Sequence, residues 1–206
     1  MSKRQNRKFS ISRRIGEALW GGEKDPFNKR NYPPGQHGSA GFGKRKSEYG
    51  TQLLAKQKLK MYYGDIREKQ FRSIFAEAKR LRGDTGENLI GLLESRLDAF
   101  IYRCKLVPTM FAARQFVSHK HVKVNGKSVN IPSYVLKIND VVEVRDKSKT
   151  MNVISESISR TDRDIPEYIT FNSNELKAVY NKVPVLAEVP YPVVIEPHYI
   201  VEFYSR

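Results

Sequence analysis

Six cationic or imidazole side chains lie within one short stretch of the sequence, at positions that an apolar core does not require. They are Arg114, His119, Lys120, His121, Lys123 and Lys127. An arginine can bind a phosphate through two hydrogen bonds at once, whereas a lysine supplies a mobile point charge. The stretch therefore predicts a surface that binds a polyanionic backbone.

A long helix is predicted just before this stretch. Asp84 and Glu87 are spaced as in a capping box, so the helix is expected to begin near Asp84 and to end before Pro108. Arg96 and Arg103 lie on one edge of its apolar face. That face is predicted from residues at helical spacing, namely Leu89, Leu92, Leu93, Leu97, Phe100 and Cys104.

A second, shorter helix is predicted after Thr109, whose hydroxyl can cap the first turn. Arg114 is expected on its outer face together with Gln115 and Ser118. The residues expected to face inward are Ala112, Ala113, Phe116 and Val117. This helix would place Arg114 on the surface, close to the cationic residues that follow it.

The pattern then alternates between apolar and polar residues, as in a half-buried antiparallel pair of strands. Asn125-Gly126 is a strong signal for a two-residue turn, because both central residues of that turn need a positive φ. A closing strand is predicted in the sequence NDVVEV. The hairpin is expected to present Lys123 and Lys127 on its solvent face, although a plain solvated strand would show the same pattern.

The distribution of charge favours the binding interpretation. The net charge is +15, from 37 Lys and Arg against 22 Asp and Glu. Residues 1–82 hold 21 basic and 7 acidic residues, whereas residues 151–206 hold 5 and 8. Such a field attracts a polyanion, and nucleic-acid phosphate is the usual one. A membrane surface is disfavoured because the basic residues interleave with Gly, Pro, Tyr and Gln instead of forming an amphipathic helix.

Composition sets further limits on the class of protein. The single cysteine, Cys104, falls on an apolar helix face and is expected to be a buried thiol. One cysteine cannot form an internal disulfide, which fits a reducing cytosol. The N-terminus has no apolar core of signal-peptide type, and no apolar run approaches a membrane span. A cytoplasmic protein is expected.

The segments before residue 84 and the C-terminal end of the chain differ in character. Residues 1–47 are basic and rich in Gly and Pro, so we expect an irregular arm that takes its shape from a partner, anchored locally by Trp20. Two helices follow, one through TQLLAKQKLKMYY that Gly64 ends, and one that ends at Gly83. The ending HYIVEFYSR is expected to form a short strand or a segment packed on the body.

The search for catalytic chemistry finds little. His119 and His121 would place both rings on one side of a strand, but no carboxylate or thiol lies at metal-ligand spacing. The sequence contains no phosphate-binding loop, dinucleotide fingerprint or nucleophile elbow in a suitable setting. We therefore predict no catalytic residue, no metal, no cofactor and no small-molecule substrate.

Several strings of this sequence resemble a known family. RLD at Arg96, AARQFVSHKHVKVNGK and NDVVEV resemble the S-four RNA-binding module, also called the alpha-L fold. YPPGQHG from Tyr32, YGTQLLAKQK from Tyr49, GDTGENL from Gly83 and the terminal IVEFYSR are similar to bacterial-type small-subunit ribosomal protein S-four. The resemblance covers nearly the full length and is weakest at about residues 148–190.

The resemblance implies an α+β fold with an extended basic N-terminal arm, a small helical domain and a module of two helices packed on a small antiparallel sheet. We expect four segments. They are an rRNA-binding arm (1–47), a helical domain (48–95, joined by 190–206), an S-four RNA-binding domain (96–160) and a C-terminal extension packing on the body (161–206).

The resemblance also implies a function. The family is a non-catalytic constituent of the small ribosomal subunit, which binds small-subunit rRNA early in assembly at a helical junction of the 5′ domain. It implies contact with ribosomal protein S-five, a place with S-three near the mRNA entry, and an influence on translational accuracy. Some members bind zinc through an N-terminal cysteine cluster, but residues 1–103 here contain no cysteine.

Folded RNA is recognised mostly through its shape, phosphates and 2′-hydroxyls, so basic, amide and aromatic side chains suit the task. The tyrosines could equally pack in a core, and charges on a helix could simply be solvated. The residues predicted to contact rRNA are Arg13, Arg14, Gln36, His37, Lys44, Arg45, Lys46, Tyr49, Gln52, Lys56, Gln57, Lys58, Tyr63, Arg72, Arg96, Arg103, Arg114, His119, Lys120, His121, Lys123, Asn125 and Lys127.

Two alternatives use the same module. Some pseudouridine synthases carry an S-four-like module and a catalytic aspartate in an R-L-D string like the one that contains Asp98. In those enzymes the string follows the module, whereas here it opens the module, and too few residues follow Val144 for a catalytic domain. A stand-alone ribosome-associated stress protein would lack the long arm and the helical domain.

Overall fold

The computed structural model describes most of the chain, namely residues 8–22, 25–36, 38, 47–161 and 163–205. Four residues predicted to contact rRNA, His37, Lys44, Arg45 and Lys46, lie outside the described residues. The chain divides into two compact units. The first unit comprises Met1–Phe71 and Tyr191–Arg206, and the second comprises Arg72–Pro190. The division falls inside a helix, and the four segments expected from the sequence stay a prediction.

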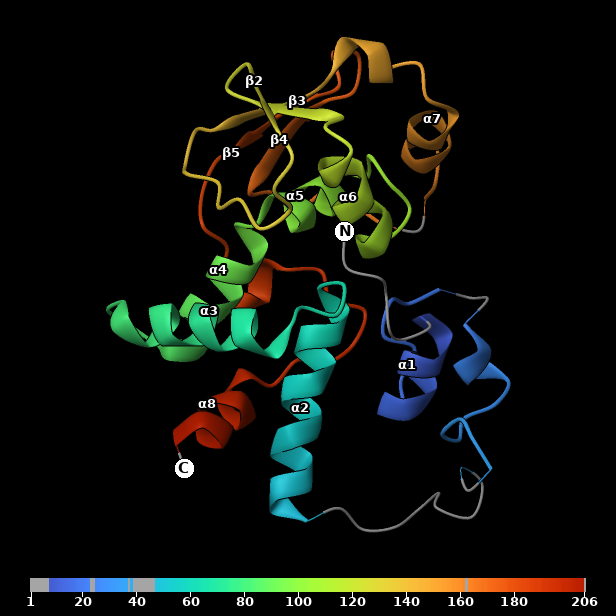
Figure 1. The fold of residues 1–206 in the computed structure, drawn as a ribbon, viewed down its shortest axis with the longest axis vertical. Coiled ribbons are helices and arrows are strands. Elements are labelled where there is room, and N and C mark those ends of the chain that lie inside the picture. Colours follow the sequence, from blue (N-terminus) through green and yellow to red (C-terminus); the bar gives the residue numbers. More distant parts are fainter. Residues whose placement is uncertain (1–7, 23–24, 37, 39–46, 162, 206) are drawn as a thin grey trace. The chain divides into compact units, whose positions relative to one another are not determined.

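The first unit is built around the long helix α2 (Glu48–Tyr62). The C-terminal helix α8 (Pro197–Ser205) lies alongside it (Figure 1). The side-chain amide of Gln52 on α2 donates a 3.0 Å hydrogen bond to Glu202 on α8. The ending was expected to be a strand or a packed segment. The predicted strand was wrong, because the ending forms a helix. Ile200 and Tyr204, one helical turn apart, both face this unit. Ile200 is fully buried, and Tyr204 stacks on Phe71.

The N-terminal segment is more ordered than expected. It forms the helix α1 (Lys8–Ile15) and the short 3-10 helix η1 (Pro26–Asn28). Ile11, Ile15 and Leu19 are buried, and the indole N–H of Trp20 donates a 3.2 Å hydrogen bond to the carbonyl of Tyr62. The expectation of an irregular arm was therefore wrong for Lys8–Ile15 and Pro26–Asn28, whereas residues 16–22 and 29–36 form turns and bends, and Trp20 anchors the segment as predicted.

The second unit begins within the helix α3 (Glu68–Arg80). Three helices then follow in close succession, α4 (Thr85–Glu94), α5 (Leu97–Arg103) and α6 (Met110–Ser118). The unit also contains α7 (Asn152–Ile158) and the 3-10 helices η2 (Asp146–Ser148) and η3 (Leu186–Glu188). Within the described residues, no helix is both long enough and apolar enough to cross a membrane.

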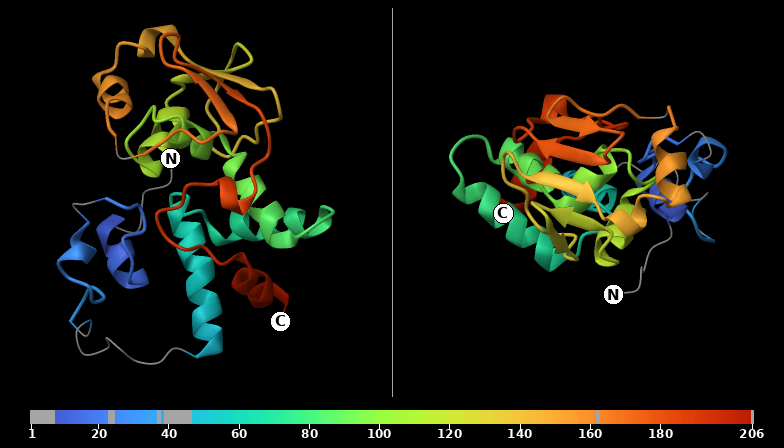
Figure 2. Two further views of the ribbon diagram at one scale, coloured as in Figure 1. Left: turned by 180° about the vertical axis from the view of Figure 1, so that it is seen from behind. Right: turned by 90° about the horizontal axis from the view of Figure 1, so that it is seen from above.

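One antiparallel sheet of five strands completes the second unit. The strands are β1 (Val122–Val124), β2 (Lys127–Val129), β3 (Val141–Val144), β4 (Ile169–Asn172) and β5 (Lys177–Tyr180), in the order β2-β1-β3-β5-β4. The predicted α+β fold with helices on an antiparallel sheet is confirmed. Strands β4 and β5 extend the sheet beyond β3 (Figure 2) and come from the segment where the sequence offered little.

The single helix predicted from Asp84 to Pro108 is in fact two helices. Asp84 caps α4 as predicted, through a 2.8 Å hydrogen bond to the backbone N–H of Glu87. The chain then becomes extended at Arg96, with φ −71° and ψ 140°. The backbone of Leu97 donates to the carbonyl of Tyr134, and Arg96 forms a β-bridge with Val135. The loop before β3 supplies these partners, which helical periodicity does not reveal.

The register of the sheet separates two lysines that were predicted to share a face. Lys123 lies opposite Ser128, whereas Lys127 lies opposite Val124. Since directly opposed residues point to the same side of a sheet, Lys123 lies on the outer face and Lys127 on the side of the buried Val124. Lys127 is exposed because β2 is an edge strand. The prediction of a common face was wrong.

Candidate nucleic-acid interface

The hairpin between β1 and β2 forms as the sequence predicts. Asn125 has φ 48° and Gly126 has φ 78°, as a two-residue turn of this kind requires. The Asn125 amide donates a 2.8 Å hydrogen bond to Asp140, and its oxygen accepts one from the backbone of Val141 at 2.9 Å. This side chain therefore fastens the turn to β3. Asn125 is exposed, and its predicted contact with RNA stays a prediction.

The end of α6 brings three predicted residues to the surface. Thr109 caps α6 as predicted, accepting a 3.1 Å hydrogen bond from the backbone of Ala112. Arg114 is partly exposed on the outer face of the helix. His119 is the C-terminal cap, and Lys120, with φ 62°, turns the chain out of the helix; both side chains are exposed.

His121 is held in a partly buried position between α6 and the segment after β3. Its Nδ1 lies 2.8 Å from the Ser148 hydroxyl, and its ring stacks on Phe116 with centroids 4.9 Å apart. Burial lowers the pKa of His121, and the nearby His119 and Arg145 lower it further. The ring is therefore neutral at physiological pH. Its contribution is to hold the neighbouring side chains in place, and it adds no charge to the surface.

Lys123, in the middle of β1, forms ion pairs with two carboxylates. Its Nζ lies 3.1 Å from a carboxylate oxygen of Asp146 and 3.9 Å from one of Glu143. The other oxygen of Asp146 lies 3.1 Å from the Nζ of Lys149. Hydrogen bonds from Lys149 and Lys123 lower the pKa of Asp146 to about 2. Part of the charge predicted for this surface is thus neutralised within the protein.

Three further cations lie beside these residues and were not predicted from the sequence. The backbone of Arg145 donates a 2.8 Å hydrogen bond to the carbonyl of His121, so the segment after β3 is fixed next to the end of α6. Arg145, Lys147 and Lys149 are all exposed. The run RDKSK directly after NDVVEV was the signal that could have revealed them. We define the module surface as Arg114, His119, Lys120, Lys123, Arg145, Lys147 and Lys149.

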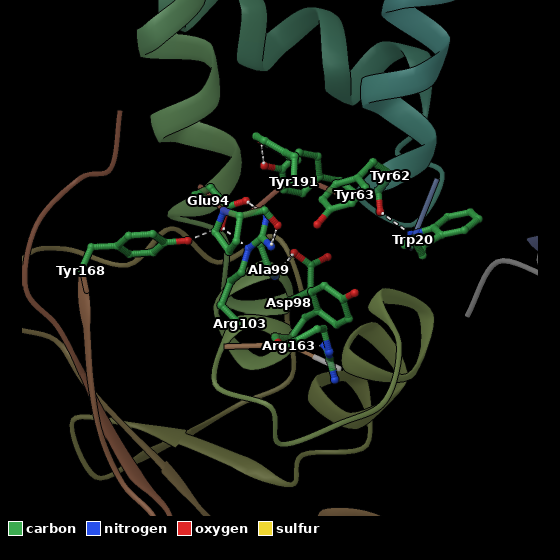
Figure 3. Close-up of polar contacts among 12 residues, drawn as sticks. Trp20, Tyr62, Tyr63, Glu94, Asp98, Ala99, Arg103, Arg163, Tyr168 and Tyr191 are labelled. Atoms are coloured by element: carbon green, nitrogen blue, oxygen red, sulfur yellow. Dashed lines mark hydrogen bonds and ion pairs between the residues drawn. The ribbon is translucent and has the colours of Figure 1, made fainter. Parts of the chain in front are cut away.

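Two predicted arginines lie in the interior of the second unit. Arg103 forms two hydrogen bonds to Glu94, at 2.7 and 3.0 Å, and Glu94 also accepts one from Tyr168 at 2.9 Å (Figure 3). Arg96 is 2 % exposed and pairs through two bonds with Asp98. Because their guanidinium groups are buried and paired, the predicted RNA contacts of Arg96 and Arg103 are corrected to structural roles.

The predicted contacts of helix α2 also need correction. Lys56 is buried, with its Nζ 3.0 Å from Glu68 and 4.2 Å from the centroid of the Phe203 ring. Lys58 is buried and pairs with Glu17. These lysines support the packing of the first unit instead of presenting charge to a partner. Their acidic partners are distant in the sequence, so spacing on α2 alone could not reveal them.

Glu68 shows how this packing affects ionisation. Burial would raise the pKa of Glu68, but hydrogen bonds from Lys56 and Tyr204, together with the charges of Lys56 and Lys60, hold it below its usual range. Gln52 and Tyr63 are likewise buried, and the hydroxyl of Tyr63 hydrogen-bonds that of Tyr191. Neither of these two side chains reaches the surface, so their predicted RNA contacts are also corrected.

Besides Asn125 and His121, seven predicted residues remain accessible outside the module surface, and one of them is Lys127 on the edge strand β2. Arg13 is partly exposed; its Nε donates a 3.0 Å hydrogen bond to the Tyr32 carbonyl and its guanidinium stacks on the Tyr32 ring. The other five are Arg14, Gln36, Tyr49, Gln57 and Arg72, of which only Gln57 is partly buried. Whether these residues bind RNA stays a prediction.

Comparison with known proteins identifies the family. A model described as the ribosomal protein S4/S9 N-terminal domain matches residues 3–94, and the S4 domain matches residues 95–142. The chain is 61% identical to the small ribosomal subunit protein uS4 of Rhizobium johnstonii, 60% to that of Rhizobium meliloti and 59% to that of Brucella ovis. Each match covers 100% of both chains. The chain belongs to the uS4 family.

Membership of the uS4 family confirms several predictions. It makes the chain a protein of the small ribosomal subunit, and the predicted ribosomal location follows. The relatives are named as a ribosomal protein, a structural class and not an enzyme. The geometry of Asp98 agrees, because this carboxylate is 1% exposed and is bonded to Arg96 and to the backbone of Ala99. It cannot reach a substrate, so the synthase alternative is not favoured.

The remaining reactive side chains of this uS4 chain are placed as structural groups. Cys104 is fully buried, and burial raises the pKa of its thiol well above the usual range. The rings of His119 and His121 lie 6.0 Å apart, not on one strand as expected but at the end of α6 and in the following loop. Among the described residues, no group of three or more His, Cys, Asp or Glu side chains could hold a metal ion.

Proposed function

We propose that this uS4 protein binds small-subunit rRNA in the 5′ domain, at a helical junction, and does so early in assembly. The observation that carries the proposal is the module surface, where α6, β1 and the segment after β3 place several exposed cations on one packed unit. The hydrogen bond from Arg145 to His121 and the ion pair from Asp146 to Lys123 tie these three segments together. RNA shape and phosphates are the features that such a surface can recognise.

The distribution of charge supports a second contact on the first unit. Residues 1–71 carry a net +11, from 17 Lys and Arg against 6 Asp and Glu, and Arg14 within this range is exposed. The two buried lysines of α2, Lys56 and Lys58, do not contribute, so the second contact depends on the exposed residues and not on these lysines. A protein that contacts RNA through both units would hold more than one rRNA helix, as an early assembly protein must.

Binding to rRNA without other ribosomal proteins is the direct test. The full chain should bind a 5′-domain rRNA fragment with at least a roughly tenfold preference over an unrelated structured RNA at about 0.15 M salt, a modest ratio for a specific complex. Filter binding with each RNA as competitor measures that preference. Equal affinity for both RNAs would contradict the proposed role.

The proposal includes neighbours on the ribosome. We propose that ribosomal protein S-five contacts this protein, that S-three lies nearby at the mRNA entry, and that the protein influences translational accuracy. The resemblance described above is the support for these three statements. Chemical cross-linking within the intact small subunit, followed by mass spectrometry, should yield cross-links from this chain to S-five. Cross-links to other proteins but none to S-five would contradict that contact.

A further inference from the structure

Asp146 places its carboxylate between two ammonium groups on the module surface. One carboxylate oxygen lies 3.1 Å from the Nζ of Lys123, and the other lies 3.1 Å from the Nζ of Lys149. A phosphodiester also presents two anionic oxygens, and lysine ammonium groups bind them as point charges. Lys123 and Lys149 are therefore spaced to bind a group with the charge and shape of a phosphate.

The two lysines are held by regular structure. Lys123 is the central residue of β1, paired across the sheet with Glu143 on β3, and Lys149 ends η2 with its backbone N–H bonded to the Asp146 carbonyl. The segment that carries η2 is fastened to the module by the bond between Ser148 and His121. The fold thus fixes the backbone positions from which the two lysine side chains extend.

The carboxylate that fills this position is easily displaced. The side chain of Asp146 is 74% exposed, whereas that of Lys123 is 27% exposed and that of Lys149 is 40% exposed. The anion therefore lies on the solvent side of the cations. Ion pairs between exposed groups are weak and are screened by salt, so a polyanion can compete for both lysines. The pKa of Asp146, held at about 2, keeps its carboxylate charged at neutral pH.

We propose that Lys123 and Lys149 form a subsite for a phosphate of the RNA backbone, which the carboxylate of Asp146 occupies in the free protein. This inference rests on the proposed rRNA binding and specifies one of its contacts. Asp146 acts as a built-in competitor, because an RNA phosphate must displace it before it can pair with both lysines. The affinity for RNA is lower than the cations alone would give.

The test is the change of Asp146 to its uncharged isostere. Asp146→Asn should bind the 5′-domain rRNA fragment roughly fivefold to tenfold more tightly at about 0.1 M salt, since one further phosphate contact releases about 0.9 of a counterion. The slope of log affinity against log salt should steepen accordingly. Glu77→Gln is the matched control, because Glu77 is an exposed acid paired with Arg80 on α3, away from the sheet, and its loss changes the net charge equally.

A second variant gives an independent measurement. Lys149→Gln leaves Asp146 in place and should weaken RNA binding and flatten the salt dependence, whether or not Asp146→Asn folds well. An Asp146→Asn protein that gains no more affinity than Glu77→Gln overturns the subsite, and so does a Lys149→Gln protein with unchanged binding. Failure of the wild-type chain to prefer the 5′-domain RNA would instead overturn the proposed function.

Discussion

Arg103 carries a charge into the interior of the second unit because the carboxylate of Glu94 accepts two of its hydrogen bonds there. Glu94 is fully buried and also accepts a hydrogen bond from the hydroxyl of Tyr168. Arg103 donates a further 3.1 Å hydrogen bond to the carbonyl of Pro190. A buried pair of this kind becomes very costly when one partner is removed, since the other charge is left uncompensated. The arginine is thus a determinant of stability.

We predict that Arg103→Met lowers the free energy of unfolding of the second unit by about 3–5 kcal/mol. Urea titration followed by circular dichroism measures the change. Arg80→Met is the matched control, because Arg80 pairs with Glu77 on the surface, where solvent screens the pair and its loss should cost far less. Equal costs for the two variants would show that the Glu94–Arg103 pair is not a buried determinant.

His121 makes the stability of the protein depend on pH. Its pKa in the folded protein lies below the ordinary value of 6.5, chiefly because of burial, so protons bind the unfolded chain more readily. Stability from this group is fully present above pH 6.5 and falls as the pH drops through the lower folded pKa. An NMR titration of the imidazole should give a midpoint below 6.5.

The variant His119→Gln separates the causes of that shift. It removes the charge of a neighbouring imidazole, so the midpoint of His121 should rise only part of the way towards 6.5, because burial remains. The variant His121→Gln should remove this part of the pH dependence of stability. A midpoint at or above 6.5 in the wild-type protein would contradict the partly buried position of the ring.

At the scale of elements, the turn between β1 and β2 sets the pairing register of the two strands, and so determines which side chains share a face of the sheet. Gly126 has φ 78°, a conformation that glycine adopts without strain. We predict that Gly126→Val destabilises the protein by at least about 1–2 kcal/mol, whereas Gly126→Asn costs less because asparagine tolerates this conformation. Thermal unfolding of the two variants measures the difference. Equal stability would mean that the turn relaxes to another form.

Local signals predicted elements well, and long-range contacts explain the failures. The caps at Asp84 and Thr109 and the turn at Asn125 form as predicted because their partners lie within a few residues. The break at Arg96 could not be predicted, since it depends on the loop residues Tyr134 and Val135.

In the candidate site, too, predictions from local signals succeeded and those that depended on long-range contacts failed. Arg114 is partly exposed on the outer face of its helix as the helical pattern indicated, and His119 and Lys120 at the helix end are exposed. Lys56 and Lys58 were misplaced because their acidic partners, Glu68 and Glu17, come from other elements of the first unit. The sequence shows where charge lies along the chain. It does not show which charges are neutralised when the chain folds.

At the scale of the whole molecule, the N-terminal segment belongs to the core of the first unit. Burial of a large aliphatic side chain contributes about 1.5–3 kcal/mol, and Ile11, Ile15 and Leu19 are all buried. Deletion of residues 1–47 should therefore destabilise the first unit by several kcal/mol, in addition to weakening RNA binding. Urea unfolding checks this, with deletion of residues 1–7, which leaves α1 whole, as the control. A stable truncated unit would restore the idea of a separable arm.

The family and the general fold were accessible from the sequence because their motifs are continuous strings, such as AARQFVSHKHVKVNGK. Strands β4 and β5 were not, since residues 148–190 carry no comparable string; β5 pairs with β3, and β4 pairs with β5. The division inside α3 was also hidden, because a continuous helix gives no sequence signal where packing changes partners.

The salt dependence of rRNA binding tests the central claim, that the module surface binds the RNA backbone. The double variant Arg114→Gln/Lys120→Gln should reduce the slope of log affinity against log salt by about 1.4–1.8, or roughly 0.7–0.9 for each lost phosphate contact. Lys79→Gln/Lys182→Gln removes two exposed charges outside the module surface and should leave the slope nearly unchanged. An unchanged slope in the first variant, with a reduced slope in the second, would contradict this location of the RNA contact.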